Sequence, residues 1–385
     1  MLQQILLKLL KRKKVIGYKK YCTNPRGRAL LFFKTDSFFV SSLAKKYSHI
    51  NYWEALEIAK MLNEFGYIVD VFDRTLDTEK TSIEDIYDVF VGIGGGMSGK
   101  SYPDIAKKLT KAVKVLFVSS QVPKVFNAAL ESRYAYFAKR HPEITLPPIG
   151  FKDGIDIEAV AATADAIFCE SEGYVLDQYK ELGKPVYQIN VPTSPYIAFS
   201  PFDIEKRDQK SFLYFGSNRN ILKGLDLLIE VFAKIPEMQL YICTPAQEEV
   251  FNETYASVLK NCKNIHWEGF VRIGSKQFND LTDQCGYVIL PSCSDSIPTS
   301  VTTCMRKGMI PVVTPECGLA VGDFGYLMNS IEISALDEQV KTISKISQQE
   351  FINRSLKTYE ASFAYTEAKF SESFRTSLMH VLLKK

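Results

Sequence analysis

The chain has 385 residues, of which 46% are hydrophobic and 24% are charged. This length favours two domains over one, and the composition is that of a folded globular protein, which excludes disordered, collagen-like and coiled-coil chains. No apolar run reaches the roughly 18 residues that a membrane-spanning helix needs.

The net charge of +3 is unevenly distributed along the chain. Residues 1–35 hold ten basic and no acidic side chains, whereas the rest has 37 basic against 44 acidic residues, a net charge of −7. The chain after residue 35 has a net negative charge and is a poor partner for polyanions, so we expect no nucleic acid as a ligand. Eight cysteines without a C-x-x-C pair indicate reduced thiols in the cytoplasm.

Residues 1–28 are predicted to form a basic, amphipathic arm. Its apolar side chains recur at helical spacing, and basic side chains flank them: Leu2, Ile5, Leu6, Leu9 and Leu10, with Lys8 and Lys11 to Lys14. The pattern fits a segment, residues 1–20, that lies on an anionic membrane surface, and it equally fits a solvated helix. The charge follows the apolar stretch, which argues against an export signal. We expect a cytoplasmic protein, with a peripheral position on the inner face of the membrane as one option.

The first half alternates β-rich runs with helical periods. The predicted strands are 29–35, 68–73, 89–93, 113–119, 166–170 and 185–189. Such alternation predicts a parallel sheet flanked by helices, here a Rossmann-like domain over 29–190. Three prolines and a charged run make 191–210 a linker.

The alternation restarts after the linker. The predicted strands are 211–216, 238–243, 264–268, 287–291 and 310–314. They define a second Rossmann-like domain over 211–365, followed by a closing helix over 366–385. The predicted fold class is therefore α/β, with two doubly wound parallel sheets facing a cleft. Ligands are expected where the strands end at that cleft.

Two segments after strands of the second half carry candidate chemistry. Gly216 and Ser217 follow the first strand, and Arg219 and Lys223 lead into a helix. Cations beside a helix N-terminus favour a di- or triphosphate, although two solvated charges would look the same. In the segment 291–308, Pro298 fits the first turn of a helix, where the free N–H groups of Thr299, Ser300 and Val301 can face an anion.

These segments together resemble a known family. Gly216-x-x-Arg219-x-x-x-Lys223-Gly, then Pro291-Ser-x-Ser-Asp-x-x-Pro298, then Gly308-x-x-Pro-Val-Val is similar to the nucleotide-sugar half of the glycosyltransferase family 4 enzymes, over about 211–328. These are retaining enzymes with the GT-B fold. The first half resembles them in architecture more than in motifs.

The resemblance implies a retaining hexosyltransferase that moves a sugar from a nucleoside diphosphate to a glycan, glycolipid or other surface-polysaccharide acceptor. It assigns Arg219 and Lys223 to the donor diphosphate and Asp295 to sugar hydroxyls. Thr303 stands where the family has a second acid, which leaves a catalytically silent GT-B binding module as an alternative. The implied donor-binding set is Gly216, Ser217, Pro298, Thr299, Ser300, Val301 and Thr303, with Phe270 and Val271 beside the base.

The first half contributes weaker candidates. His49 and Asn51 open the helix after the first strand and are expected to face the cleft, where His49 would contact the transferred sugar or the acceptor unless its role is structural. Gly94 and Gly95 form part of a glycine-rich turn at the cleft. Arg133 and Arg140 lie seven residues apart on a helix and would grip an acceptor phosphate or form a solvated face.

Two further expectations concern cofactors. The chain has no D-x-D triplet, so we expect no catalytic metal and no cofactor apart from the nucleotide-sugar co-substrate. Gly94 to Ser101 satisfies the P-loop pattern G-x-x-x-x-G-K-S, which keeps a nucleoside triphosphatase as a second alternative. Pro103 follows closely, and no later strand of this half ends in the acid that would hold magnesium.

Overall fold

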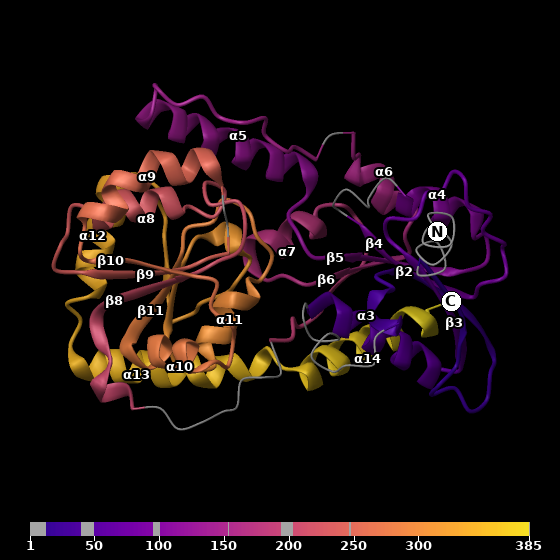
Figure 1. The fold of residues 1–385 in the computed structure, drawn as a ribbon. Coiled ribbons are helices and arrows are strands. Elements are labelled where there is room, and N and C mark those ends of the chain that lie inside the picture. The colour runs from indigo at the N-terminus through magenta and orange to yellow at the C-terminus, as the bar shows by residue number, and fades with distance from the viewer. Residues whose placement is uncertain are drawn as a thin grey trace, which may run out of the picture.

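The computed structural model describes residues 13–39, 50–94, 101–152, 154–193, 203–245 and 248–384. Two parallel-dominated sheets with helices on both faces confirm the expected α/β fold class (Figure 1). No helix in these ranges is long and apolar enough to cross a membrane. Most of the predicted membrane-surface segment lies outside them, so that expectation stays a prediction.

The N-terminal sheet has the strand order β1-β3-β2-β4-β5-β6-β7. Its strands are β1 (Lys14–Tyr18), β2 (Gly27–Phe33), β3 (Tyr67–Asp73), β4 (Val89–Gly94), β5 (Val113–Val118), β6 (Ala166–Cys169) and β7 (Val186–Gln188). All neighbours are parallel except β1, which runs antiparallel to β3. The six predicted strands are therefore present, within one or two residues at most ends.

Strand β1 differs from the prediction, because its five residues lie in the segment that the sequence predicts to be the basic arm. The Gly17 N–H donates to Oδ1 of Asp70 at 2.7 Å, and the Lys14 ammonium lies 4.6 Å from the centre of the Phe72 ring. Cationic side chains suit an edge strand, since they discourage pairing with other chains. The basic segment thus forms part of the sheet from residue 14 onward.

Helices cover both faces of this sheet. Alternate residues of β2 point to opposite faces: Leu31 packs with α3 (Ile50–Glu64), and Leu30 packs with α4 (Ser101–Lys108), α6 (Ile157–Ala162) and α7 (Gly173–Lys180). Two-sided burial explains why the strands are almost continuously apolar.

Short 3-10 helices lie at η1 (Asp36–Phe39), η3 (Ile204–Lys206), η4 (Pro315–Cys317) and η5 (Ser362–Ala364).

The C-terminal sheet is parallel throughout, in the order β10-β9-β8-β11-β12-β13. Its strands are β8 (Asp208–Phe215), β9 (Gln239–Cys243), β10 (Ile265–Gly269), β11 (Cys285–Leu290), β12 (Ile310–Val313) and β13 (Tyr326–Leu327). The helices around it are α8 (Leu225–Phe232), α9 (Glu249–Asn261), α10 (Lys276–Gln284), α11 (Thr299–Met305), α12 (Ile333–Ile343) and α13 (Gln348–Ala361). Strand β8 begins inside the predicted linker.

Two helices cross between the halves in opposite directions (Figure 1). Helix α5 (Pro123–Arg140) leaves the N-terminal sheet and buries Phe137 in the C-terminal core. Helix α14 (Glu367–Leu383) returns to the N-terminal sheet, where Phe370 meets Trp53 edge to face with ring centres 5.4 Å apart. Each half therefore supplies part of the other's core.

The contact of α5 with the second half includes buried charge. The Arg140 guanidinium donates to the carboxylates of Asp226 and Glu230 on α8. The Asp226 side chain is fully buried, and burial raises the pKa of its carboxyl despite the neighbouring arginines. Removing one partner of a buried ion pair leaves an uncompensated charge.

Arg140→Ala is therefore expected to lower the free energy of unfolding by about 3–5 kcal/mol, because Asp226 loses its hydrogen-bonded partner. Denaturant unfolding followed by circular dichroism measures this change. The control is Lys139→Ala, which removes an exposed cation from the adjacent position. Equal midpoints for the two variants would contradict the prediction.

Candidate active site

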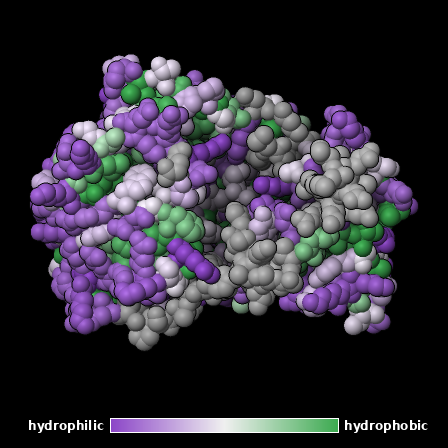
Figure 2. Space-filling model, viewed as in Figure 1, coloured by the Kyte–Doolittle hydropathy of each residue, from purple (hydrophilic) through white to green (hydrophobic). Residues whose placement is uncertain are grey.

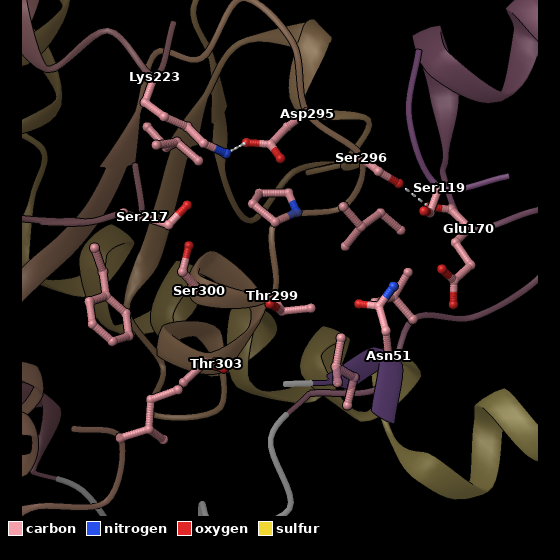
Figure 3. Close-up of a pocket in the computed structure, with 18 of the residues that line it drawn as sticks. Asn51, Ser119, Glu170, Ser217, Lys223, Asp295, Ser296, Thr299, Ser300 and Thr303 are labelled. Carbon is pink, nitrogen blue, oxygen red and sulfur yellow. Dashed lines mark hydrogen bonds and ion pairs between the residues drawn. The ribbon is translucent and has the colours of Figure 1, made fainter. Parts of the chain in front are cut away.

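A cavity of about 560 Å³ lies between the two halves. Figure 2 shows the molecule hollowed there, and Figure 3 shows side chains from both halves pointing into the hollow. Its lining includes residues that directly follow strands: Ser119 after β5, Glu170 after β6, Gly216 after β8 and the 295–300 segment after β11. Strand ends of both sheets thus meet in one space, as expected for doubly wound sheets.

Lys223 and Asp295 form an ion pair on the C-terminal wall of the cavity (Figure 3). Their side chains are about one-sixth exposed, so the pair is partly desolvated but reachable from the cavity. Lys223 ends a turn before α8, and Asp295 is fixed by its N–H, which donates to the Glu316 carbonyl at 2.9 Å. The arrangement presents an ammonium and a carboxylate to the same ligand.

The turn that carries Lys223 requires a glycine. Gly224 has φ 74°, and a Cβ there would lie 2.4 Å from the Pro291 carbonyl oxygen and 2.7 Å from Nη1 of Arg133. A side chain would therefore force apart the two loops that hold Lys223 and Asp295.

Arg219 does not line the cavity with Lys223. Its backbone is left-handed, with φ 72°, and its N–H donates to the Glu248 carboxylate, which also accepts from the Asn220 N–H at 3.0 Å. A Cβ built on Gly150 would lie 3.3 Å from Nη2 of Arg219. Burial, together with the Arg219 charge, lowers the pKa of nearby Lys152 to about 8. The structure thus separates the two predicted diphosphate cations.

The predicted donor-binding residues are only partly brought together. Gly216, Ser217, Pro298, Thr299, Ser300 and Thr303 line the cavity. Val301 does not: it is fully buried, and its N–H donates to the Pro298 carbonyl at 2.9 Å. That turn bond removes one of the three N–H groups expected to face an anion.

The segment expected beside the base also lies outside the lining. Phe270 is 72% exposed, and Val271 is buried in the C-terminal core. Ile273, two residues further on, does line the cavity.

The first-half candidates have different outcomes. Asn51 lines the cavity, whereas Gly94 is buried at the end of β4, where a Cβ would lie 2.3 Å from Leu116. His49 and Gly95 lie outside the described residues, as does most of the P-loop motif, so these remain predictions.

The expected acceptor role of Arg133 is corrected by its position. The side chain is buried, and its guanidinium donates to the carbonyls of Ile221 at 3.3 Å and Pro291 at 2.8 Å. Arg140 is held in its ion pairs with α8. Neither residue forms a solvated face or reaches the cavity, because α5 packs on the second half along its length.

Sequence reasoning missed a pair of acids in the cavity wall. Glu54 on α3 and Glu170 after β6 both line the cavity, are almost fully buried and are close enough for each to influence the pKa of the other. Glu54 shares a helix face with apolar Ile58, and Glu170 ends a predicted strand. The sequence contains two signals for this pair: an acid on an otherwise apolar helix face, and an acid at the end of a predicted strand.

The chain is similar to known proteins in part of its sequence and in its fold. Residues 209–345 match the family model described as "Glycosyl transferases group 1". No curated protein matches the chain.

Solved structures show the fold. HepE from Anabaena, in complex with UDP and glucose, is 13% identical over 93% of this chain and 100% of its own, with a TM-score of 0.56. TarM is 12% identical over 76% of this chain and 54% of its own, with a TM-score of 0.51. The GtfA/B complex is 14% identical over 76% of this chain and 57% of its own, with a TM-score of 0.51. The chain spans little more than half the length of these last two.

The chain therefore has the GT-B fold of glycosyltransferases. Residues 209–345 in its second half match the glycosyl transferases group 1 model, which confirms the resemblance predicted over 211–328. The cavity lies between this domain and the N-terminal sheet.

Protonation of the buried acids gives a testable stability effect. Burial raises the pKa of Glu54 to about 7, so its contribution to stability is complete below the ordinary carboxyl range and is lost as pH rises to about 7. Glu54→Gln keeps the shape without the charge. We compare the free energy of unfolding of this variant with that of the unmodified chain. The difference, variant minus unmodified chain, is expected to increase by on the order of 1 kcal/mol or more between pH 5 and pH 8.

Denaturant unfolding at several pH values measures this difference. The control is Glu131→Gln, an exposed acid on α5. A difference that stays constant with pH would show that Glu54 does not titrate with burial in this way.

Proposed function

We propose that the protein transfers a hexosyl group from a nucleoside diphosphate sugar to a glycan, glycolipid or other polysaccharide acceptor, with retention at the anomeric carbon. The observation that carries the proposal is the Lys223–Asp295 pair, which lies at the strand ends of a glycosyl transferases group 1 domain and faces the other half across one cavity. The similar HepE structure holds UDP and glucose.

Each group on the C-terminal wall has a chemical role in this proposal. Departure of the nucleotide builds negative charge on the diphosphate, which the Lys223 ammonium stabilises. Asp295, released from Lys223, accepts hydrogen bonds from sugar hydroxyls. The N–H groups of Thr299 and Ser300 lie in the first turn of α11 and can donate to phosphate oxygens. Arg219 would join Lys223 by a rotation of its side chain.

Thr303 takes the place of an acid beside the nucleotide. Among the described residues, its buried Oγ1 has no hydrogen-bond partner, and the residue lines the cavity. A ribose hydroxyl would supply that partner. A silent binding module would keep this contact and lack turnover, so activity measurements decide between the two.

Lys223→Ala is expected to reduce kcat by about 10²- to 10³-fold, the usual loss when one preorganised charge donor is removed. Arg219→Ala is expected to have a comparable effect if its side chain rotates into the cavity. Transfer of radiolabelled sugar measures both. The control is Lys234→Ala, an exposed lysine just after α8. Unchanged kcat in Lys223→Ala would remove this residue from the reaction.

A panel of UDP, GDP, ADP and CMP sugars tests the donor, with ATP as competitor. We expect one diphosphate sugar to raise the melting temperature both with magnesium and with EDTA, because fixed cations replace a metal. A response only to ATP with magnesium would overturn the proposal in favour of the P-loop. The anomeric configuration of the product, measured by NMR, tests retention.

We place the reaction in the cytoplasm. All eight cysteines are free, which suits a reducing compartment. The part of residues 1–20 that precedes β1 would hold the protein on an anionic membrane. We expect co-sedimentation with phosphatidylglycerol vesicles and its loss when Lys11 and Lys13 are replaced by Glu.

A further inference from the structure

The N-terminal wall of the cavity carries two acids for which the proposed function gives no role. Glu54 and Glu170 are 1% and 3% exposed, and their carboxyl groups are close enough for each to influence the pKa of the other. Figure 3 shows the Glu170 carboxyl group pointing into the cavity beside the Asn51 amide. Within the described part of the chain, Oε2 of Glu54 and Oε1 of Glu170 have no hydrogen-bond partner.

The backbone holds this wall firmly against the other half. The Glu170 carbonyl accepts a hydrogen bond from the Ser296 hydroxyl, and the Ser296 and Ser171 hydroxyls lie 2.7 Å apart. Ser296 is the neighbour of Asp295. The acid pair and the Lys223–Asp295 pair therefore border one cavity from opposite halves, and Ser296 connects the two walls.

The two acids cannot both be ionised without a large cost. Burial raises the pKa of both carboxyls, and the Glu54 charge raises that of Glu170 further. The Lys34 ammonium acts on Glu54 in the opposite direction. A pair that shares one proton offers one O–H donor and several acceptor oxygens in a small space, with one negative charge.

We propose that Glu54 and Glu170 form a subsite that binds adjacent hydroxyl groups of a neutral sugar. Neighbouring hydroxyls both donate and accept hydrogen bonds, so they match a shared-proton carboxyl pair with unpartnered oxygens. A uronate or sugar phosphate would bring a second anion to a buried negative charge and is disfavoured. The subsite thus selects the sugar, while Lys223 binds the diphosphate.

This inference rests on the proposed function for the origin of the sugar, which is either the acceptor or the transferred group of the donor. The binding chemistry is the same for both. If the sugar is the acceptor, the affinity for a free glycoside depends on the acids. If it is the transferred group, the affinity for the nucleotide sugar depends on them and the affinity for the nucleotide alone does not.

The experiment measures calorimetric binding to the full chain and to Glu54→Gln and Glu170→Gln. The probes are methyl glycosides of glucose, galactose, mannose and N-acetylglucosamine, each with and without UDP, and glucuronate as the anionic counterpart. UDP and UDP-glucose are titrated separately. Glu57→Gln is the control, since Glu57 lies on the same helix but pairs with Lys60. Melting temperatures verify that each variant is folded.

We expect at least one neutral glycoside to bind at least about tenfold more tightly than glucuronate. Each variant is expected to weaken the binding of that glycoside by a similar factor and to keep the affinity for UDP. Weaker binding of UDP-glucose but not of UDP would assign the subsite to the transferred sugar.

Three results would overturn the inference. The first is that both folded variants bind glycosides and UDP-glucose as tightly as the unmodified chain. The second is that glucuronate binds more tightly than every neutral probe. The third is that no neutral probe, UDP-glucose included, binds in any titration. Failure of every nucleotide to bind, with a glycoside still held by the acids, would instead refute the proposed donor and leave the subsite intact.

Discussion

The arrangement of the site depends on one buried guanidinium. Arg133 belongs to a helix of the N-terminal half, yet it donates to the carbonyls of Ile221 and Pro291 in the second half. Ile221 lies in the turn that leads to Lys223, and Pro291 begins the loop that leads to Asp295. A cation buried between two carbonyls fixes the separation of these loops, since releasing either carbonyl would leave a buried polar group unpaired.

The cavity thereby has two walls of different chemistry. The C-terminal wall pairs a cation with an anion, and the N-terminal wall pairs two acids. The Lys223 ammonium on one wall and the two acids on the other orient a ligand that has a charged end and a hydroxyl-rich end. Such orientation lowers the entropy lost when two reactants must meet.

Sequence patterns predicted the sheets well, because buried parallel strands are continuous apolar runs whatever their partners. They failed where tertiary contact decides. The seven-residue spacing of Arg133 and Arg140 indicated a shared side of a helix, but not that this side would be covered by the other half. Val301 likewise had the right position, and a local turn bond to Pro298 used its N–H.

The return of α14 has a consequence for synthesis on the ribosome. The Ser371 hydroxyl donates to the Glu57 carboxylate, a contact spanning 314 residues. Phe370, Phe374 and Leu378 pack with α3 against one face of the first sheet, so that face lacks part of its cover until α14 has been translated. Domains usually fold in the order in which they emerge. Here the half made first completes its native packing only after the second half has been made, and the part of its apolar face that α14 covers stays exposed until then.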